Sequence, residues 1–321
     1  MERRLFLVVA VAVIVAGLAL TRVLQNQYYY LAGYVILQYV VLATAWNILG
    51  GYTGYVNFGT PAFFALGAYT SVVLIKMLGA PLPVLLMASA IVPGLLGLGL
   101  GYLTLRLRGV FFSIATLALA VVLQTAFINW EYTGGARGTS LVRPATAPLF
   151  GSYVEFLFVV MLVLAVAAVA VAWWIESSWI GRGLAAIRDN EEAAECMGVP
   201  TLKLKLVATT VSGILMGVAG APFPYHVTFI EPTSVFDLNY AVNSLAMPMI
   251  GGTTTWMGPV IGAVLLGTAQ QIATVTISSA ANLLIVGGIL VAFVILAPEG
   301  IVGLVRRLAR RGDERTRRSG A

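Results

Sequence analysis

Residues 154–175 read VEFLFVVMLVLAVAAVAVAWWI, and the one charged side chain of this run, Glu155, lies at its edge. About 20 consecutive apolar residues are enough for an α-helix to cross the hydrocarbon core of a bilayer. Comparable runs recur along the chain, near positions 5–24, 31–49, 61–78, 84–105, 110–128, 207–224, 238–250, 258–277 and 281–297. The sequence therefore predicts an all-α polytopic membrane protein with about ten transmembrane helices, or about eight to ten because the run at 238–250 is short.

The composition supports the same fold class. The chain has 321 residues, of which 60% are hydrophobic and 10% charged, and its mean hydropathy is +0.94. A soluble domain carries roughly 25% charged residues, so this chain could not cover a water-facing surface. Disordered proteins are excluded by the high hydrophobicity, and outer-membrane barrels are excluded because the apolar runs are continuous instead of alternating.

The first apolar run has two interpretations. Glu2, Arg3 and Arg4 precede it, as the charged residues of a signal peptide would. The run is long for a signal peptide and lacks a clear small-x-small cleavage site, so we expect a retained helix.

Charge asymmetry predicts the orientation. Of the 19 basic residues, seven lie in a short tail after the last apolar run: Arg306, Arg307, Arg310, Arg311, Arg315, Arg317 and Arg318. Ten spans place this tail on the same side as the basic 176–206 loop and the N-terminus, which predicts that both termini are cytoplasmic. We expect a single transmembrane domain over residues 1–305 and a basic cytoplasmic tail over 306–321. The arginines of this tail account for the net charge of +6, and we expect them to contact anionic membrane lipid. We therefore expect no nucleic-acid partner.

The sequence offers few candidates for catalytic or metal-binding residues. Cys196 is the single cysteine and His226 the single histidine, so we expect no metal site and no disulfide. No Ser/His/Asp arrangement and no pair of intramembrane carboxylates is visible, so we expect no catalytic residues and no enzyme. Ionisable residues are also absent from the middle of the predicted spans, which argues against proton coupling. Sodium coupling through carbonyls and hydroxyls stays possible.

Two glycine-rich polar segments, 50–61 and 132–138, are too polar to be continuous lipid-facing helices, so we expect broken helices there. A helix that begins near Pro61 would direct free backbone N–H groups toward an anion such as a carboxylate. An ordinary interfacial loop is the equal alternative. Asn57, Gln124 and Thr133 are candidates for a translocation path, although each could equally form hydrogen bonds between helices.

The most informative loop reads GRGLAAIRDNEEAAECMGVP over residues 181–200. Asp189 is a suitable N-cap, and Glu192 three residues later completes a capping-box pattern. Gly198 followed by Pro200 is a stop signal. The sequence thus predicts a short capped helix between two spans, which could dock into a groove on another protein. Three glutamates on this helix argue against the alternative of a helix lying on lipid.

This loop carries a family resemblance. Glu192-Ala193-Ala194-x-x-x-Gly198 is similar to the core of the cytoplasmic coupling loop in ABC-importer permeases. Further stretches at 50–70, 107–117, 133–135 and 251–263 follow the order of one family, so the chain resembles the LivM-type permease of branched-chain amino acid ABC transporters. The segment Asn57-Phe58-Gly59-Thr60 departs from the family's frequent Ser-Leu-Gly-His-like run, which puts the substrate in question.

The resemblance implies a non-catalytic permease subunit that moves Leu, Ile, Val or a related small amino acid or amide across the inner membrane. It implies four kinds of partner: a LivH-like second permease, two cytoplasmic ATPase subunits, an extracytoplasmic substrate-binding protein and membrane lipid. ATP and Mg would be bound by the ATPases, and no cofactor by this chain. The coupling helix would lie in a loop at about 176–206, with the coupling role carried by Asp189, Glu192, Ala193, Ala194 and Gly198. The alternatives are a permease for urea or another small amide, and a self-sufficient secondary transporter.

Overall fold

The computed structural model describes residues 3–23, 26–104, 107, 109–144, 150–276, 287–288, 291 and 300–304. Most of the expected span at 281–297 and the whole basic tail at 306–321 lie outside these residues. The predictions for the last span and for the tail are therefore not addressed by the structure.

Eight of the described helices are long and apolar enough to cross a membrane. They are α1 (Arg3–Val23), α2 (Gln27–Thr53), α3 (Thr60–Leu78), α4 (Leu82–Thr104), α5 (Val110–Ile128), α6 (Tyr153–Ser177), α9 (Thr201–Gly220) and α13 (Met257–Thr276). Each overlaps one of the runs expected from hydropathy. The prediction of an all-α polytopic membrane protein is confirmed.

The remaining elements are short: η1 (Glu131–Thr133), η2 (Gly135–Arg137), β1 (Thr139–Ser140), α7 (Trp179–Asp189), α8 (Glu191–Cys196), α10 (Phe223–Val227), β2 (Phe229–Ile230), α11 (Pro232–Val235) and α12 (Leu238–Gly251). The expected span at 238–250 is α12, which has 14 residues. At 1.5 Å per residue it is about 21 Å long, well short of a hydrocarbon core of about 30 Å. The helix is short because Asp237 caps its start and Gly252, with φ of 117°, ends it.

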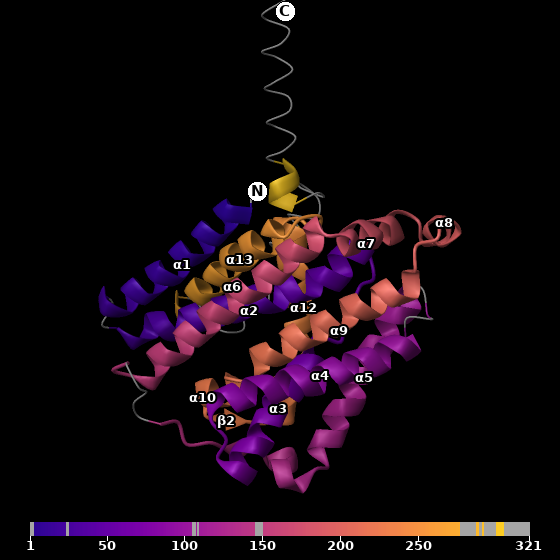
Figure 1. Ribbon diagram of the computed structural model, residues 1–321. Helices are drawn as coiled ribbons and strands as arrows, with labels where there is room; N and C mark the ends of the chain where they lie inside the picture. The colour runs from indigo at the N-terminus through magenta and orange to yellow at the C-terminus, as the bar shows by residue number, and fades with distance from the viewer. Residues whose placement is uncertain are drawn as a thin grey trace, which may run out of the picture.

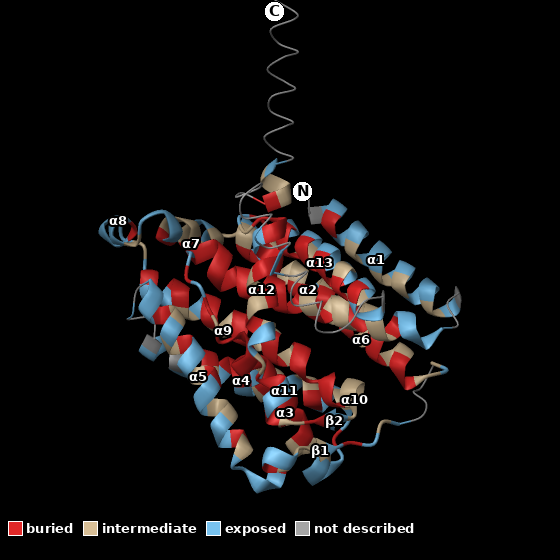
Figure 2. Ribbon diagram, turned by 180° about the vertical axis from the view of Figure 1, so that it is seen from behind, coloured by how far each residue is buried: buried red, intermediate tan, exposed pale blue. Residues whose placement is uncertain are grey.

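Helix α2 forms the centre of the bundle and packs against α6, α9, α12 and α13. Every residue from Val40 to Thr53 is buried. In Figure 2 the buried residues gather on α2, α9 and α12, while α1 and α5 expose much of their surface at the periphery. An exposed apolar surface of this kind is what lipid-facing helices present.

Small residues bring the helix backbones close together. A Cβ added to Gly217 of α9 would lie 2.3 Å from the carbonyl oxygen of Ser89 in α4. One added to Gly262 of α13 would lie 1.8 Å from the carbonyl oxygen of Met247 in α12. Lipid tails supply no hydrophobic force between helices, so such close contacts provide much of the packing energy.

The two ends of the bundle differ. Figure 1 shows the start of α1 together with α7 and α8 at one end, hereafter the α8 end, and α10 and β2 at the opposite end, hereafter the β end. At the β end, β1 pairs antiparallel with β2, with Thr139 opposite Ile230. Arg143 follows β1 and donates hydrogen bonds to the carbonyls of Tyr225 (2.6 Å) and His226 in α10. These bonds connect the segment before α6 to the helices that follow α9.

Candidate coupling loop and path residues

Helices α7 and α8 connect α6 to α9 at the α8 end. Helix α7 begins after Ser178, whose hydroxyl accepts hydrogen bonds from the N–H groups of Ile180 (3.1 Å) and Gly181 (3.4 Å). Leu184 and Ile187 are buried and hold α7 against the bundle. Helix α8 then projects beyond α7 at the edge of the molecule (Figure 1). The predicted short helix between two spans is present.

The start of α8 differs from the sequence prediction. Asn190, and not Asp189, is the N-cap, because Asn190 has the extended backbone (φ −163°) and its Oδ1 accepts from the N–H of Ala193 at 3.0 Å. Asp189 is the last residue of α7, and its carboxylate lies 3.5 Å from the guanidinium of Arg188. Glu192 is consequently the second helical residue, so the expected capping box is wrong. Asn and Asp are comparable caps, and the chain bends one residue later than expected.

The end of α8 agrees with the prediction. Gly198 has φ of 84°, a left-handed conformation that Gly adopts without a steric penalty. The N–H of Gly198 donates to the carbonyl of Glu195 (2.9 Å), and that of Val199 donates to the carbonyl of Ala194 (3.0 Å). The stop signal at Gly198 is therefore confirmed.

The five predicted coupling residues lie together on this loop but face different ways. Asp189, Glu192, Ala193 and Gly198 are exposed, whereas Ala194 is buried and seats α8 on the bundle. Because much of α8 faces away from the bundle, its exposed side is a surface that a partner could contact. Cys196 is also exposed on this helix.

Sequence reasoning missed a buried charged group beneath α8. Lys205 lies in the first turns of α9 with a side-chain exposure of 3%, and its Nζ is 2.5 Å from Oε1 of Glu191. The hydroxyl of Tyr55 donates to Oε2 of Glu191 (2.5 Å) and accepts from Nζ of Lys205 (3.3 Å). Tyr55 is 136 residues away from Glu191 in the sequence, and Lys205 is 14 residues away, which is not a helical spacing, so no local pattern could have paired them. The sequence suggested only a basic residue and an acidic one in the same loop.

Tyr55 belongs to a non-helical segment, residues 54–59, that connects α2 to α3. Sequence reasoning placed the non-helical stretch at 50–61, but residues 50–53 form the last turn of α2 and α3 begins at Thr60. Both boundaries of the expected stretch are therefore corrected. The glycines and the threonine at the buried end of α2 retain its helical hydrogen bonds. The segment begins at Gly54, whose φ of 78° ends α2. Pro61 occupies the first turn of α3, as predicted.

Hydrogen bonds fix the 54–59 segment to α2 and α5. The indole N–H of Trp46 donates to the carbonyl of Asn57 (2.8 Å), and the hydroxyl of Ser113 donates to the carbonyl of Val56 (2.8 Å). The N–H of Phe58 donates to the hydroxyl of Thr116 (3.1 Å). The segment is therefore an ordered connection, with its backbone bonded to two helices.

The structure does not bring the three candidate path residues into one site. Asn57 is buried, and its Oδ1 accepts from the N–H of Gly59 (2.7 Å) just before α3. Gln124 is half-buried on α5, eight residues beyond Thr116, which corresponds to about 12 Å along the helix. Thr133 is buried in η1, past the end of α5, and its hydroxyl donates to the carbonyl of Trp130 (2.9 Å). The three residues therefore lie beside the start, along the middle and past the end of α5.

The α8 end contains a second polar junction, at Glu176 near the end of α6. Its Oε2 accepts from the N–H of Trp256 (2.6 Å) and from the hydroxyl of Tyr52 (3.3 Å). Glu176 therefore ties α6 to α2 and to the connection between α12 and α13. Together with Arg182 and Arg188 it lines a cavity of about 160 Å³.

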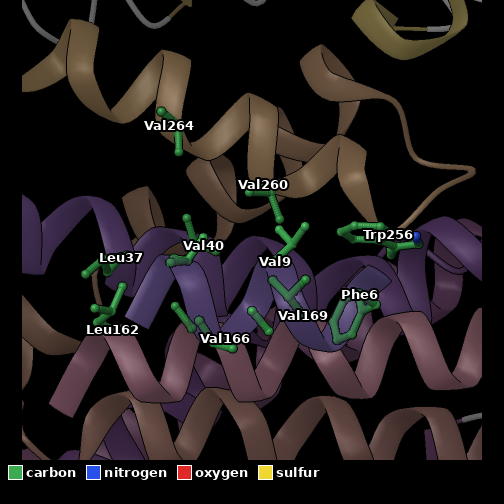
Figure 3. Close-up of a pocket in the computed structure, with 13 residues that line it drawn as sticks. Phe6, Val9, Leu37, Val40, Leu162, Val166, Val169, Trp256, Val260 and Val264 are labelled. Atoms are coloured by element: carbon green, nitrogen blue, oxygen red, sulfur yellow. The ribbon is translucent and has the colours of Figure 1, made fainter. Parts of the chain in front are cut away.

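A larger cavity of about 270 Å³ lies between α1, α2, α6 and α13. Figure 3 shows side chains such as Phe6, Leu37, Val166 and Val264 pointing into it from these helices. Its lining is apolar, so it offers no group that could orient the ammonium or carboxylate of an amino acid. Among the residues that the structure describes, no cluster of three or more His, Cys, Asp or Glu is placed to hold a metal ion.

Comparison with known protein families shows to which family this chain belongs. The family described as the permease component of branched-chain amino acid transport systems matches residues 31–294. The chain belongs to this family. The matched region extends from Leu31 in α2 through α13 and includes the 54–59 segment and the α7–α8 loop. The resemblance inferred from Glu192, Ala193, Ala194 and Gly198 together with the other stretches is confirmed.

Individual relatives agree with the family. The chain is similar to the high-affinity branched-chain amino acid transport permease LivM of Salmonella typhimurium, at 28% identity over 84% of this chain and 68% of the relative. LivM of Escherichia coli is 27% identical over the same shares. A probable LivH permease of Methanocaldococcus jannaschii is 27% identical over 83% of this chain and 88% of the relative. No solved structure matches the chain.

Proposed function

We propose that this chain is a non-catalytic permease subunit of an ABC importer in the inner membrane. It moves leucine, isoleucine, valine or a related small amino acid, and the driving ATP is hydrolysed in partner subunits. The observation that carries the proposal is α8, a capped helix at one end of the bundle with an exposed acidic face. A self-sufficient carrier has no use for such a helix, whereas a subunit driven from outside needs a surface on which force can act.

The proposal assigns partners to the two ends. Two ATPase subunits, which hold ATP and Mg, contact Asp189, Glu192, Ala193 and Gly198 at the α8 end. An extracytoplasmic binding protein delivers substrate at the β end, and a LivH-like permease completes the membrane unit. The α8 end is then cytoplasmic, in agreement with the basic loop at 176–206 and with the start of α1 at the same end of the bundle (Figure 1).

Substrate recognition within this chain is expected to be weak. Asn57, Gln124 and Thr133 lie at different depths, which suits brief contacts along a path better than one tight site. Helix ends and hydroxyls can hold a zwitterion, and aliphatic surface can hold its side chain. Selectivity is then set mainly by the binding protein that delivers the substrate.

Cys196 provides a direct test, because it is the single cysteine of the chain and lies exposed on α8. A membrane-impermeant maleimide is applied to inside-out vesicles that contain the permease with or without its ATPases. We expect rapid labelling without the ATPases and slow labelling in the assembled complex. The matched control carries Cys196→Ser and Ser140→Cys, which places the cysteine at exposed Ser140 on β1. This control should react only from the opposite side of the membrane.

Uptake completes the test. Proteoliposomes that hold the full complex should accumulate leucine with ATP and a loaded binding protein, whereas this chain alone should not. Equal labelling of Cys196 with and without ATPases would contradict docking at α8. Uphill leucine uptake by the isolated chain would show that it is a secondary transporter.

A further inference from the structure

Glu191, Lys205 and Tyr55 join three elements that are separate in the sequence: α8, α9 and the 54–59 segment. We propose that these three side chains form the linkage through which displacement of α8 is passed to the 54–59 segment and to α5. They act as positioning residues, since none of them needs to touch substrate. The inference rests on the proposed function, in which partner ATPases displace α8.

The geometry makes the linkage short and stiff. Each carboxylate oxygen of Glu191 has its own partner, with Lys205 at 2.5 Å from Oε1 and Tyr55 at 2.5 Å from Oε2. Lys205 also lies over the ring of Tyr55, 4.8 Å from its centroid. The side chains of Lys205 and Glu191 are 3% and 15% exposed. Charge-assisted bonds at this depth resist separation, because moving one partner away leaves a buried charge unpaired.

The position of Glu191 suits it to transmit motion. It is the first residue of α8, directly after the N-cap, and its side chain points inward while Glu192 and Ala193 are exposed. A partner can therefore press on the outer side of α8 without contacting Glu191. A second bond, from the hydroxyl of Thr201 to Oε1 of Glu195 (2.6 Å), attaches α8 to the start of α9. That bond does not involve the 54–59 segment, so it provides a comparison.

From Tyr55, the displacement passes to α5. The Tyr55 ring meets Phe112 of α5 edge-on at 5.2 Å between centroids. The next residues of the segment are bonded to α5, through Val56 with Ser113 and Phe58 with Thr116. A shift of Tyr55 therefore displaces α5 and the start of α3 together, and α5 also carries Gln124.

A role in coupling differs measurably from a role in stability. Removal of a linkage lets the ATPases turn over without moving the helices, so the solute taken up per ATP falls. Loss of folded protein lowers uptake and ATP hydrolysis in proportion and leaves their ratio unchanged. The ratio is therefore the decisive readout.

Tyr55→Phe is the sharpest variant, because it removes the hydroxyl and keeps the ring against Phe112 and under Lys205. It is tested in the full complex in proteoliposomes, with leucine uptake and ATP hydrolysis measured together. We expect the leucine-to-ATP ratio to fall about tenfold, as for the loss of one hydrogen bond to a charged group. Glu191→Gln should lower the ratio as well, and the exchange of charges in Glu191→Lys with Lys205→Glu should restore part of it.

Two controls separate the alternatives. Thr201→Ala removes the other α8–α9 bond, from the Thr201 hydroxyl to the Glu195 carboxylate. Because that bond does not reach the 54–59 segment, the ratio should stay within about twofold of the parent. Glu155→Gln neutralises a carboxylate at the far end of α6 and should not change the ratio. If Thr201→Ala lowers the ratio and Tyr55→Phe does not, attachment of α8 to α9 is sufficient and the linkage is refuted.

Failure of the linkage can be distinguished from failure of the proposed function. If the parent complex takes up leucine with ATP and Tyr55→Phe keeps the parental ratio, the linkage is wrong and the importer stands. A proportional loss of both activities in Tyr55→Phe, with a lowered unfolding temperature, likewise refutes it in favour of a structural role. If the parent complex shows no ATP-dependent uptake, both proposals fall.

Discussion

Gly217 lies where three helices meet, and its replacement by Ala should destabilise the bundle. The added Cβ would be 2.3 Å from the carbonyl oxygen of Ser89 and 2.4 Å from Cγ of Pro93, both in α4. The carbonyl of Gly217 itself blocks any Cβ on Gly67 of α3, at 2.1 Å. Because a backbone carbonyl and a proline ring cannot rotate away, α4 and α9 must separate.

The loss of stability in Gly217→Ala is the balance of opposing contributions. Overpacking of a close contact costs about 1–3 kcal/mol. Movement of α4 away from α9 also strains the hydrogen bond from the Ser89 hydroxyl in α4 to the carbonyl of Gly67 in α3 (2.8 Å), worth about 1 kcal/mol. Ala favours the helix over Gly by about 1 kcal/mol. The net loss is about 1–3 kcal/mol, which lowers the unfolding temperature by roughly 2–10 °C in a chain of this size.

The assay is thermal unfolding in detergent, followed by tryptophan fluorescence at one scan rate for all variants, since membrane proteins often unfold irreversibly. Gly99→Ala is the matched control, because Gly99 lies on α4 and an added Cβ meets no atom within 4 Å. It should raise the unfolding temperature slightly through helix propensity. If Gly217→Ala is as stable as Gly99→Ala, the reasoning from backbone contact is wrong.

Further predictions concern polar junctions. Asn190→Ala should destabilise α8 by about 1 kcal/mol through loss of its cap, seen as faster amide exchange in α8, whereas Asp189→Ala should have little effect. Glu176→Leu leaves the partly buried backbone N–H of Trp256 without its acceptor, and we expect a loss of about 1–3 kcal/mol in thermal unfolding. Arg143→Ala removes two charge-assisted bonds to α10, with an expected loss of about 1.5–3 kcal/mol and faster proteolysis of the segment before α6.

Each of these has an outcome that would contradict it. Faster amide exchange in α8 of Asp189→Ala than of Asn190→Ala would restore Asp189 as the cap. Glu176→Gln keeps an acceptor for Trp256 and should be milder than Glu176→Leu. Because both variants remove the charge, an equal loss in the two would show that the charge, and not the hydrogen bond, matters. For Arg143, an Arg143→Lys variant that behaves like the parent would show that the forked geometry of the guanidinium is unimportant.

Much of the fold could be predicted from the sequence because its signals are local. A membrane span depends on the apolarity of consecutive residues, and the eight long helices appear where hydropathy placed them. The stop at Gly198 could also be predicted, since Gly is the residue that most readily adopts the left-handed conformation at a helix end. The N-cap could not, because Asp189 and Asn190 are adjacent and cap equally well. Only the bend of the chain against the bundle selects Asn190.

The sequence by itself determined that this protein folds in a membrane, where the eight long helices that the structure describes lie, and that a short acidic helix lies between two of them. These properties follow from composition and from residues within a few positions of each other. Only the tertiary structure decided that α12 stays a partial helix inside the bundle and that Asn57, Gln124 and Thr133 lie apart along α5. It also decided that Glu191, Lys205 and Tyr55 meet. Such contacts join residues up to 150 positions apart, and only the packing of whole helices determines which distant side chains become neighbours.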